Sequence, residues 1–137
     1  RNKVSGPLLD RIDIQIEVES VPVTQIAMKS AEEPSAKIRE RVNAARQIQI
    51  KRYSKEGITC NAQLTARMFE KYCKLTPSAN QLLTSAAEMM RLSSRGYTRV
   101  LKVARTIADL AGGGDITETH VAEAVQYRSL DGKYWNT

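Results

Sequence analysis

The fold is decided by residues 93–114, which read Ser93-Ser-Arg-Gly-Tyr-Thr-Arg-Val-Leu-Lys-Val-Ala-Arg-Thr-Ile-Ala-Asp-Leu-Ala-Gly-Gly-Gly114. Apolar side chains recur in this stretch every three or four residues, which is the spacing of one face of an α-helix. Ser93 or Ser94 can cap the start of this helix, and Gly112–Gly114 ends it. We therefore predict a helix over about residues 95–111. Its inward positions are Val100, Val103, Ala104, Ile107 and Leu110.

Similar patterns on both sides predict a helical bundle. The pair Thr76-Pro77 predicts the start of a helix that runs to about residue 90. Thr117 is the predicted cap of a last helix over 118–128. Upstream, apolar periodicity predicts helices over about 35–53 and, capped by Asn61, over 62–73, and a short helix over 24–30. The inward positions expected in these helices are Ile38, Val42, Ala45 and Ile48; Leu64, Met68 and Tyr72; Ala79, Leu82, Leu83, Ala86 and one of Met89 and Met90; and Val121, Val125 and one of Ala122 and Ala124.

Residues 11–18 follow a different pattern, because apolar and polar side chains alternate there. The apolar positions are Ile12, Ile14, Ile16 and Val18. A period of two predicts a strand with one buried face, and Pro22 ends it. A single strand is not stable alone, so we expect its partners to lie in a longer protein from which this chain was cut. The fold class predicted is therefore mainly α, with four to five helices preceded by one strand-like segment.

Composition and charge narrow the function without fixing it. The chain has 137 residues, of which 42% are hydrophobic, and its formal net charge is +6. Such a charge suits nucleic acid, nucleotide phosphates or simple solubility. Cys60 and Cys73 form no CxxC pair, which argues against a zinc site or a disulfide framework. With no membrane-length apolar run and no signal peptide, we expect a cytoplasmic protein that binds no membrane.

No self-contained catalytic site is visible in the sequence. His120 stands at the start of a predicted helix, where a surface or capping role is expected. Asp10 and Asp13 could imitate a carboxylate pair, but an exposed strand face explains them better. No glycine-rich phosphate loop is present, and Gly112–Gly114 is interpreted as a helix stop because no strand precedes it.

Two arginine placements are better candidates for chemistry. Arg11 stands where the strand begins, so its guanidinium can project from a surface; a local ion pair with Asp10 or Asp13 is the alternative. Arg95, Arg99 and Lys102 lie on one face of the helix after Ser94, with Arg105 nearby. These cations and the helix N-terminus could together bind a polyphosphate, although an ordinary solvated face is the alternative.

Several motifs, in order, closely resemble the C-terminal part of the magnesium-chelatase-like AAA+ ATPases, and best the bacterial competence-associated (ComM-type) group. The likeness covers about residues 4–130. The motifs are Ser5-Gly-Pro-Leu-Leu-Asp-Arg-Ile-Asp-Ile14, Ile38-Arg-Glu-Arg-Val-Asn-Ala-Ala-Arg46, Asn61-Ala-Gln-Leu64, Val100-Leu-Lys-Val-Ala-Arg-Thr-Ile-Ala-Asp-Leu110 and Ala124-Val-Gln-Tyr-Arg128.

The resemblance implies a ring-forming, hexameric ATPase with its nucleotide site between subunits and its Walker motifs upstream. Residues 1–22 would then end the AAA+ core, 23–130 would form the helical lid, and 131–137 would be a tail. ATP and Mg²⁺ would bind the full-length protein. This chain alone should bind neither, should be inactive and should be monomeric.

The resemblance also assigns roles to the arginines. Arg11 matches the arginine finger, which acts in trans on the γ-phosphate held by the neighbouring subunit. Arg95 matches the sensor-2 arginine, which touches the nucleotide in cis, and Arg99 is a second candidate for nucleotide binding. Ile12 stands where related ATPases often have Phe after the finger.

The substrate of the motor is open at this stage. The competence-type relatives act on DNA, as branch-migration helicases in natural transformation and recombination, and DNA remodelling is the function expected here. The alternatives are the motor subunit of a magnesium-chelatase-type complex, a helical nucleic-acid-binding module without ATPase role, and a protein-interaction bundle.

Overall fold

The computed structural model describes residues 7–8, 11–16 and 32–128. These residues are mainly helical, which confirms the predicted mainly α fold class. They contain no strand. The elements, in order, are α3 (Ser35–Arg52), the 3₁₀ turns η1 (Asn61–Gln63) and η2 (Ala66–Met68), α4 (Phe69–Tyr72), α5 (Pro77–Met90), α6 (Ser94–Leu110) and α7 (Glu118–Gln126).

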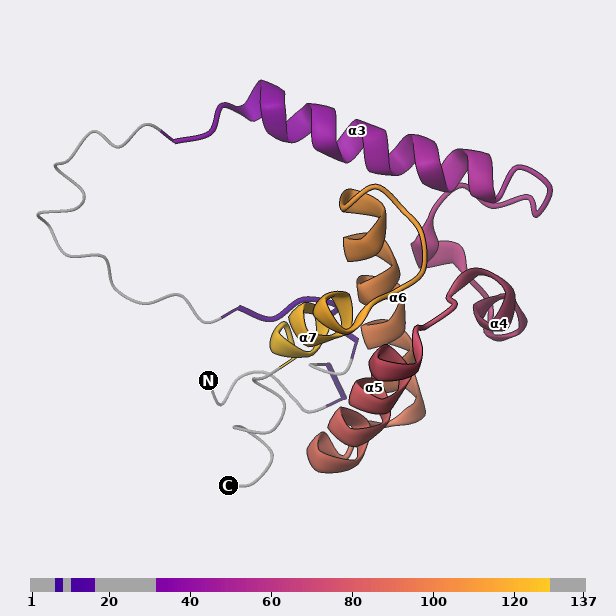
Figure 1. Cartoon of the computed structure of the whole chain (residues 1–137), viewed down its shortest axis with the longest axis vertical. Coiled ribbons are helices and arrows are strands. Elements are labelled where there is room, and N and C mark those ends of the chain that lie inside the picture. Colours follow the sequence, from indigo (N-terminus) through magenta and orange to yellow (C-terminus); the bar gives the residue numbers. More distant parts are fainter. Residues whose placement is uncertain (1–6, 9–10, 17–31, 129–137) are drawn as a thin grey trace, which may run out of the picture.

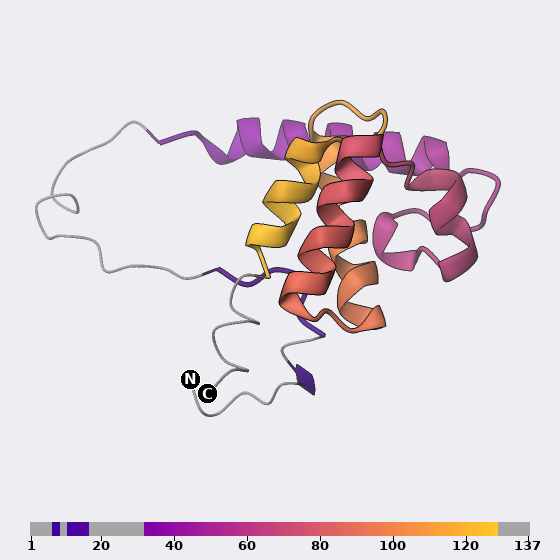
Figure 2. The same cartoon turned by 60° about the horizontal axis from the view of Figure 1, so that its bottom comes forward.

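Helix α6 is the centre of the bundle. It packs against α7 and α3, while α7 also packs against α5 (Figures 1 and 2). The apolar core lies between these helices and includes five fully or almost fully buried side chains from α5, α6 and α7, Leu83, Val100, Ala104, Val121 and Ala124. The predicted inward faces of α5, α6 and α7 are thus largely confirmed.

The ends of the helices follow the local signals in the sequence. The amide of Ala79 donates to Thr76 Oγ1 at 3.2 Å, and the amide of Gly96 donates to Ser93 Oγ at 2.9 Å. Ser93, and not Ser94, is therefore the cap of α6. At the other end, Gly112–Gly114 have φ angles of 112°, 92° and 87°, a region that side chains disfavour. These glycines stop α6 as predicted.

The prediction of one continuous helix over 62–73 is wrong. Two 3₁₀ turns and the short α4 replace it, because Leu64 and Thr65 have extended ψ angles of 133° and 164°. Asn61 is the first residue of η1 and not its cap. Its side chain is turned inward instead, where Tyr53 Oη donates to Asn61 Oδ1 at 2.6 Å. The apolar spacing is kept, since Leu64 and Met68 are buried, but the backbone is not a continuous helix.

The strand predicted from residue 11 is also wrong for the described part, residues 11–16. Ile12, Ile14 and Ile16 are 39%, 49% and 64% exposed, whereas Gln15 is 6% exposed. Within residues 7–8, 11–16 and 32–128 no strand lies beside the segment to pair with it. Its backbone is held by the end of α7 instead, which buries Gln15 and turns the isoleucines outward.

Some expected inward positions prove to be exposed. Ile38 and Val42 are 43% and 42% exposed, because the first turns of α3 extend past the bundle (Figures 1 and 2). Leu110 is also exposed, at 47%. Of the two alternatives Met89 and Met90, Met90 is the half-buried one, whereas Met89 is 85% exposed. The helix predicted over 24–30, Val18, Pro22 and the tail over 131–137 lie outside the described residues.

Candidate functional site

The exposed start of α6 carries Arg95, one of the arginines predicted to bind nucleotide. Arg95 lies in the first turn of the helix and is exposed to solvent. No described residue hydrogen-bonds to its guanidinium or forms an ion pair with it. Its backbone is fixed by the Ser93 cap and the buried Gly96 next to it. Arg95 therefore has a fixed base and a free cationic end.

Arg99, one turn further along α6, lies beside the N-terminal segment. Its Nη1 donates to Asp13 Oδ1 in an ion pair, with 28% and 57% of the two side chains exposed. Arg11, two residues before Asp13, is exposed, and its amide closes a turn by donating to the carbonyl of Leu8 at 3.1 Å. The structure thus brings the segment of Arg11 to the same helix that carries Arg95 and Arg99.

Two further contacts hold this segment, and the sequence did not reveal them. Arg128, just beyond α7, is fully buried, and its Nη1 donates to the carbonyl of Ile12 at 2.9 Å. The amide of Gln15 donates to the carbonyl of Tyr127 at 2.7 Å. Figure 1 shows the indigo segment passing beside the yellow end of α7. In the sequence, Arg128 is the last residue of the family-like motif 124–128, and nothing there indicates a contact with residues 11–16.

The remaining cations of the α6 group have structural partners. Lys102 Nζ donates to the carbonyl of Ala62 at 3.2 Å. Arg105 is 3% exposed; its guanidinium donates to the carbonyls of Tyr72, at 3.1 Å, and Gly114. Arg105 is therefore part of the core rather than of a phosphate-binding face.

A buried polar network joins α3, η1 and α6. Both carboxylate oxygens of Asp109, which is 1% exposed, accept from the guanidinium of Arg52. Asn61 Nδ2 donates to Asp109 Oδ2 at 2.9 Å, and Arg105 Nη2 lies 3.4 Å from Asp109 Oδ1. The hydrogen bond to Asp109 raises the pKa of Arg52. The network fixes how α3 lies on α6.

His120 and the cysteines offer no catalytic group. The ring Nδ1 of His120 accepts from the amide of Thr117 at 3.0 Å, which confirms the capping role. Cys60 is half-buried, and burial raises the pKa of the Cys73 thiol to about 11. In the part of the chain that the structure describes, no group of three or more His, Cys, Asp or Glu could hold a metal ion.

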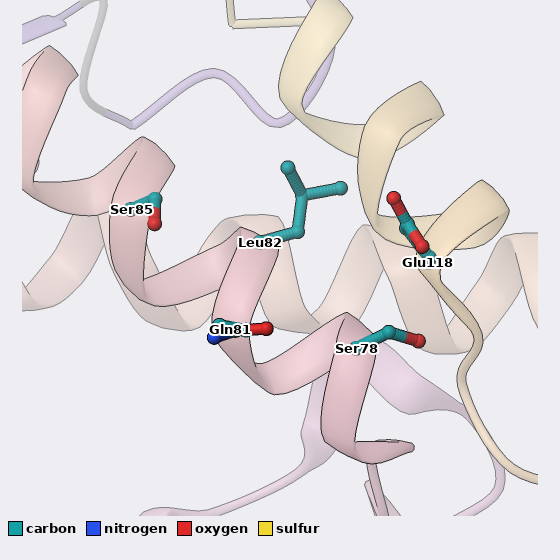
Figure 3. Close-up of a pocket in the computed structure, with 5 residues that line it drawn as sticks. All are labelled: Ser78, Gln81, Leu82, Ser85 and Glu118. Atoms are coloured by element: carbon teal, nitrogen blue, oxygen red, sulfur yellow. The ribbon is translucent and has the colours of Figure 1, made fainter.

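A shallow hollow lies between α5 and the start of α7 (Figure 3). Its volume is about 270 Å³, and it is lined by Ser78, Gln81, Leu82, Ser85 and Glu118. This lining contains a carboxylate and no cation, so it does not suit a polyphosphate. None of the predicted arginines lines it. Among the described helices, none is both long and apolar enough to cross a bilayer.

Comparison with known proteins adds a family and several relatives. Residues 32–128 match the family model described as "Magnesium chelatase, subunit ChlI C-terminal". The chain is 42% identical over 130 residues to the competence protein ComM of Haemophilus influenzae, covering 94% of this chain and 25% of that protein. It is 40% identical over 132 residues to the uncharacterized protein YifB of Escherichia coli, covering 95% and 25%. The chain thus spans about a quarter of the length of these curated relatives.

Proposed function

The chain belongs to the magnesium chelatase ChlI C-terminal family, as a region of the ComM type, and from this premise we propose that it serves a DNA-remodelling AAA+ motor. Its helical bundle is a lid-type C-terminal domain. In the proposal, a longer protein forms a ring, hydrolyses ATP and couples hydrolysis to branch migration or a related DNA rearrangement. The Haemophilus relative is named a competence protein, and the competence-type group that this chain resembles is expected to act on DNA, which supports this substrate.

The observation that carries the proposal is the arrangement of three arginines around α6. Arg95 is exposed in the first turn, and Arg99 one turn later is paired with Asp13. Through this pair the segment of the exposed Arg11 lies against the same helix. The guanidiniums of Arg95 and Arg11, which pair with no described residue, are each suited to bind phosphate oxygens.

The proposed roles of the two exposed arginines differ. Arg95 would contact the phosphates of the nucleotide bound to its own subunit, at a helix start where N–H groups also favour anions. Arg11 would reach the γ-phosphate held by the neighbouring subunit and stabilise the charge that develops during transfer. Arg99 would take part in nucleotide binding only if its pairing with Asp13 opened.

The arginines fit one of the two expected cofactors, ATP, but not the other, Mg²⁺. Guanidinium groups match phosphate oxygens, so the arginines fit ATP. Mg²⁺ requires oxygen ligands, and the described residues offer no cluster of three or more acidic side chains or other potential ligands for it. In the proposal, the arginines bind phosphate, while Mg²⁺, which neutralises phosphate charge when bound, is held by the nucleotide and by residues outside this chain.

The outer face of α3 supports DNA as the substrate. Arg39, Arg46 and Lys51 are exposed there, and no described acidic residue pairs with them. Arg39 and Arg46 are seven residues apart, so they lie on the same side of the helix, two turns from each other. A row of unpaired cations can contact successive phosphates of a nucleic-acid backbone.

The test uses the longer protein and measures ATP affinity and turnover with and without DNA. DNA should stimulate turnover, and Arg95→Ala should weaken ATP binding and lower kcat. Arg67→Ala removes another exposed cation, on η2, and should change neither. If Arg95→Ala has unchanged kinetics, Arg95 is an ordinary surface residue.

The family description favours a second candidate, the motor subunit of a magnesium-chelatase-type complex. In that case ATP turnover would be indifferent to DNA. A third candidate, a helical nucleic-acid-binding module, is tested by titrating the 137-residue chain with DNA at two salt concentrations. Submicromolar binding that falls steeply with salt would favour the module, whereas the lid proposal expects weak binding by the chain alone.

A further inference from the structure

We infer that Arg128, aided by Arg99, is a positioning residue that fixes Arg11 to the lid, so that the finger and the lid move as one body. The inference rests on the proposed function, because it assigns a purpose to the contacts around Arg11. The sequence and the family resemblance gave Arg128 no role, and they suggested Arg11, not Arg99, as the partner of Asp13.

The central contact is the buried one. Arg128 is 0% exposed, and its Nη1 donates at 2.9 Å to the carbonyl of Ile12, the residue that directly follows Arg11. A hydrogen bond from a charged group that is shielded from water is stronger than a neutral exposed one. This bond fixes the backbone one residue away from the proposed finger.

Two further contacts hold the same segment, one at the end of α7 and one on α6. The amide of Gln15, itself 6% exposed, donates to the carbonyl of Tyr127 at 2.7 Å. Asp13 pairs with Arg99 on α6. Three contacts within four residues leave the segment little freedom to move relative to α6 and α7.

Arg11 itself is left free to act elsewhere. Its side chain is exposed, and among the described residues nothing hydrogen-bonds to its guanidinium. Its backbone is confined by the turn to Leu8. A fixed base with a free end is the arrangement required of a group that must reach a site on another molecule.

A mechanical consequence follows. Arg95, which would contact the subunit's own nucleotide, and Arg99, which holds the finger segment, are one turn apart on α6. A lid movement caused by the subunit's own nucleotide would therefore displace Arg11 at the neighbour's site. This would couple successive ATP sites around a ring.

The first experiment measures the docking itself by amide hydrogen exchange of the 137-residue chain. Arg128→Met should lower the protection of the Gln15 amide at least tenfold, and Arg128→Lys, which keeps the charge, should lower it less. The amide of Ala104 in α6 reports whether the fold is intact. Unchanged Gln15 protection in Arg128→Met with α6 intact would overturn the inference.

A second variant keeps the inference falsifiable if Arg128→Met unfolds the chain. Asp13→Arg places two cations together at an exposed position without touching the core. In the longer protein it should lower kcat for ATP at least tenfold with ATP affinity within twofold. Glu33→Arg, which disrupts the exposed pair with Arg41 on α3, is the matched control and should leave both unchanged. A wild-type kcat in Asp13→Arg would contradict the inference.

Subunit mixing separates positioning from simple stabilisation. Asp13→Arg subunits are mixed with subunits that cannot bind ATP but retain Arg11. If the defect lies in the finger, mixed rings should hydrolyse ATP faster than the sum of the separate proteins, as Arg11→Ala subunits should. If mixtures with Arg11→Ala recover activity but mixtures with Asp13→Arg do not, the positioning role is refuted while the proposed function stands. Full turnover by Arg11→Ala would instead refute the proposed function.

Discussion

The two carboxylate oxygens of Asp109, near the end of α6, bind the guanidinium of Arg52, at the end of α3, across 57 residues of sequence. Asp109 is 1% exposed and also accepts from Asn61 Nδ2. This pair fixes α3 on the helix that carries Arg95 and Arg99. The orientation of the outer α3 face relative to these arginines therefore depends on a buried ion pair.

We expect Asp109→Ala to destabilise the chain by about 3–5 kcal/mol, because the variant leaves the guanidiniums of Arg52 and Arg105 without a compensating charge. Urea unfolding followed by circular dichroism measures the loss. Arg41→Ala, which breaks the exposed pair between Arg41 of α3 and Glu33 before the helix, is the control and should cause no measurable change. Equal stabilities for the two variants would show that the Asp109 network does not hold α3.

The cap of α6 provides a more local test. Ser93→Ala should cost about 1 kcal/mol, since the amide of Gly96 loses its acceptor. Ser94→Ala changes the neighbouring exposed serine, which does not cap the helix, and should be close to neutral. The two unfolding free energies, measured under the same conditions, decide between these serines. A larger loss of stability for Ser94→Ala than for Ser93→Ala would show that Ser93 is not the cap.

Burial of Cys73 predicts a dependence on alkaline pH. Burial raises the pKa of the thiol from 9.0 to about 11, so folding favours the protonated form. This contribution to stability is complete below about pH 9 and should be lost, by about 2 kcal/mol, as the pH rises to 11. Cys73→Ala should lose less stability over the same range, because it has no thiol to titrate.

Thiol reactivity checks the same assignment at neutral pH. In the folded chain, iodoacetamide should modify the half-buried Cys60 faster than Cys73, as measured by mass spectrometry of the two peptides. Equal rates in the folded chain would contradict the burial of Cys73.

Local signals predicted the start of α5 and both ends of α6 well. Thr76-Pro77, Ser93 and Gly112–Gly114 each act on the backbone within one turn, so their effects can be predicted without knowing the fold. For the same reason, the shared face of Arg95 and Arg99 followed from helix geometry alone.

The failures came from contacts between distant residues. Leu64, Met68 and Tyr72 have helical spacing, but Asn61 is bound to Asp109 of α6 instead of capping a helix. The alternation of Ile12, Ile14 and Ile16 could not show which side would be buried, since that depends on what lies beside the segment.

The same limit applies to the candidate site. The bond from Arg128 to the carbonyl of Ile12 joins residues 116 positions apart, and no periodic pattern points to it. The roles proposed for Arg11, Arg95 and Arg99 came from the family resemblance, and they remain predictions that only nucleotide chemistry can test.

The outer face of α3 makes a separate prediction about DNA. In the longer protein, the double variant Arg39→Gln and Arg46→Gln should weaken DNA binding uniformly across sequences. The slope of log affinity against log salt should fall in magnitude by about 2, as expected when two phosphate contacts are lost. Arg67→Gln is the control for charge alone, and an equal effect in that variant would mean that α3 has no special part.

The most direct measurement of the central claim is ATP turnover and ATP affinity of Arg11→Ala in the longer protein, measured side by side. The account predicts that affinity stays within twofold while turnover falls by about 10³-fold or more, the typical contribution of an arginine finger. An Arg11→Ala protein that hydrolyses ATP at the wild-type rate would contradict it.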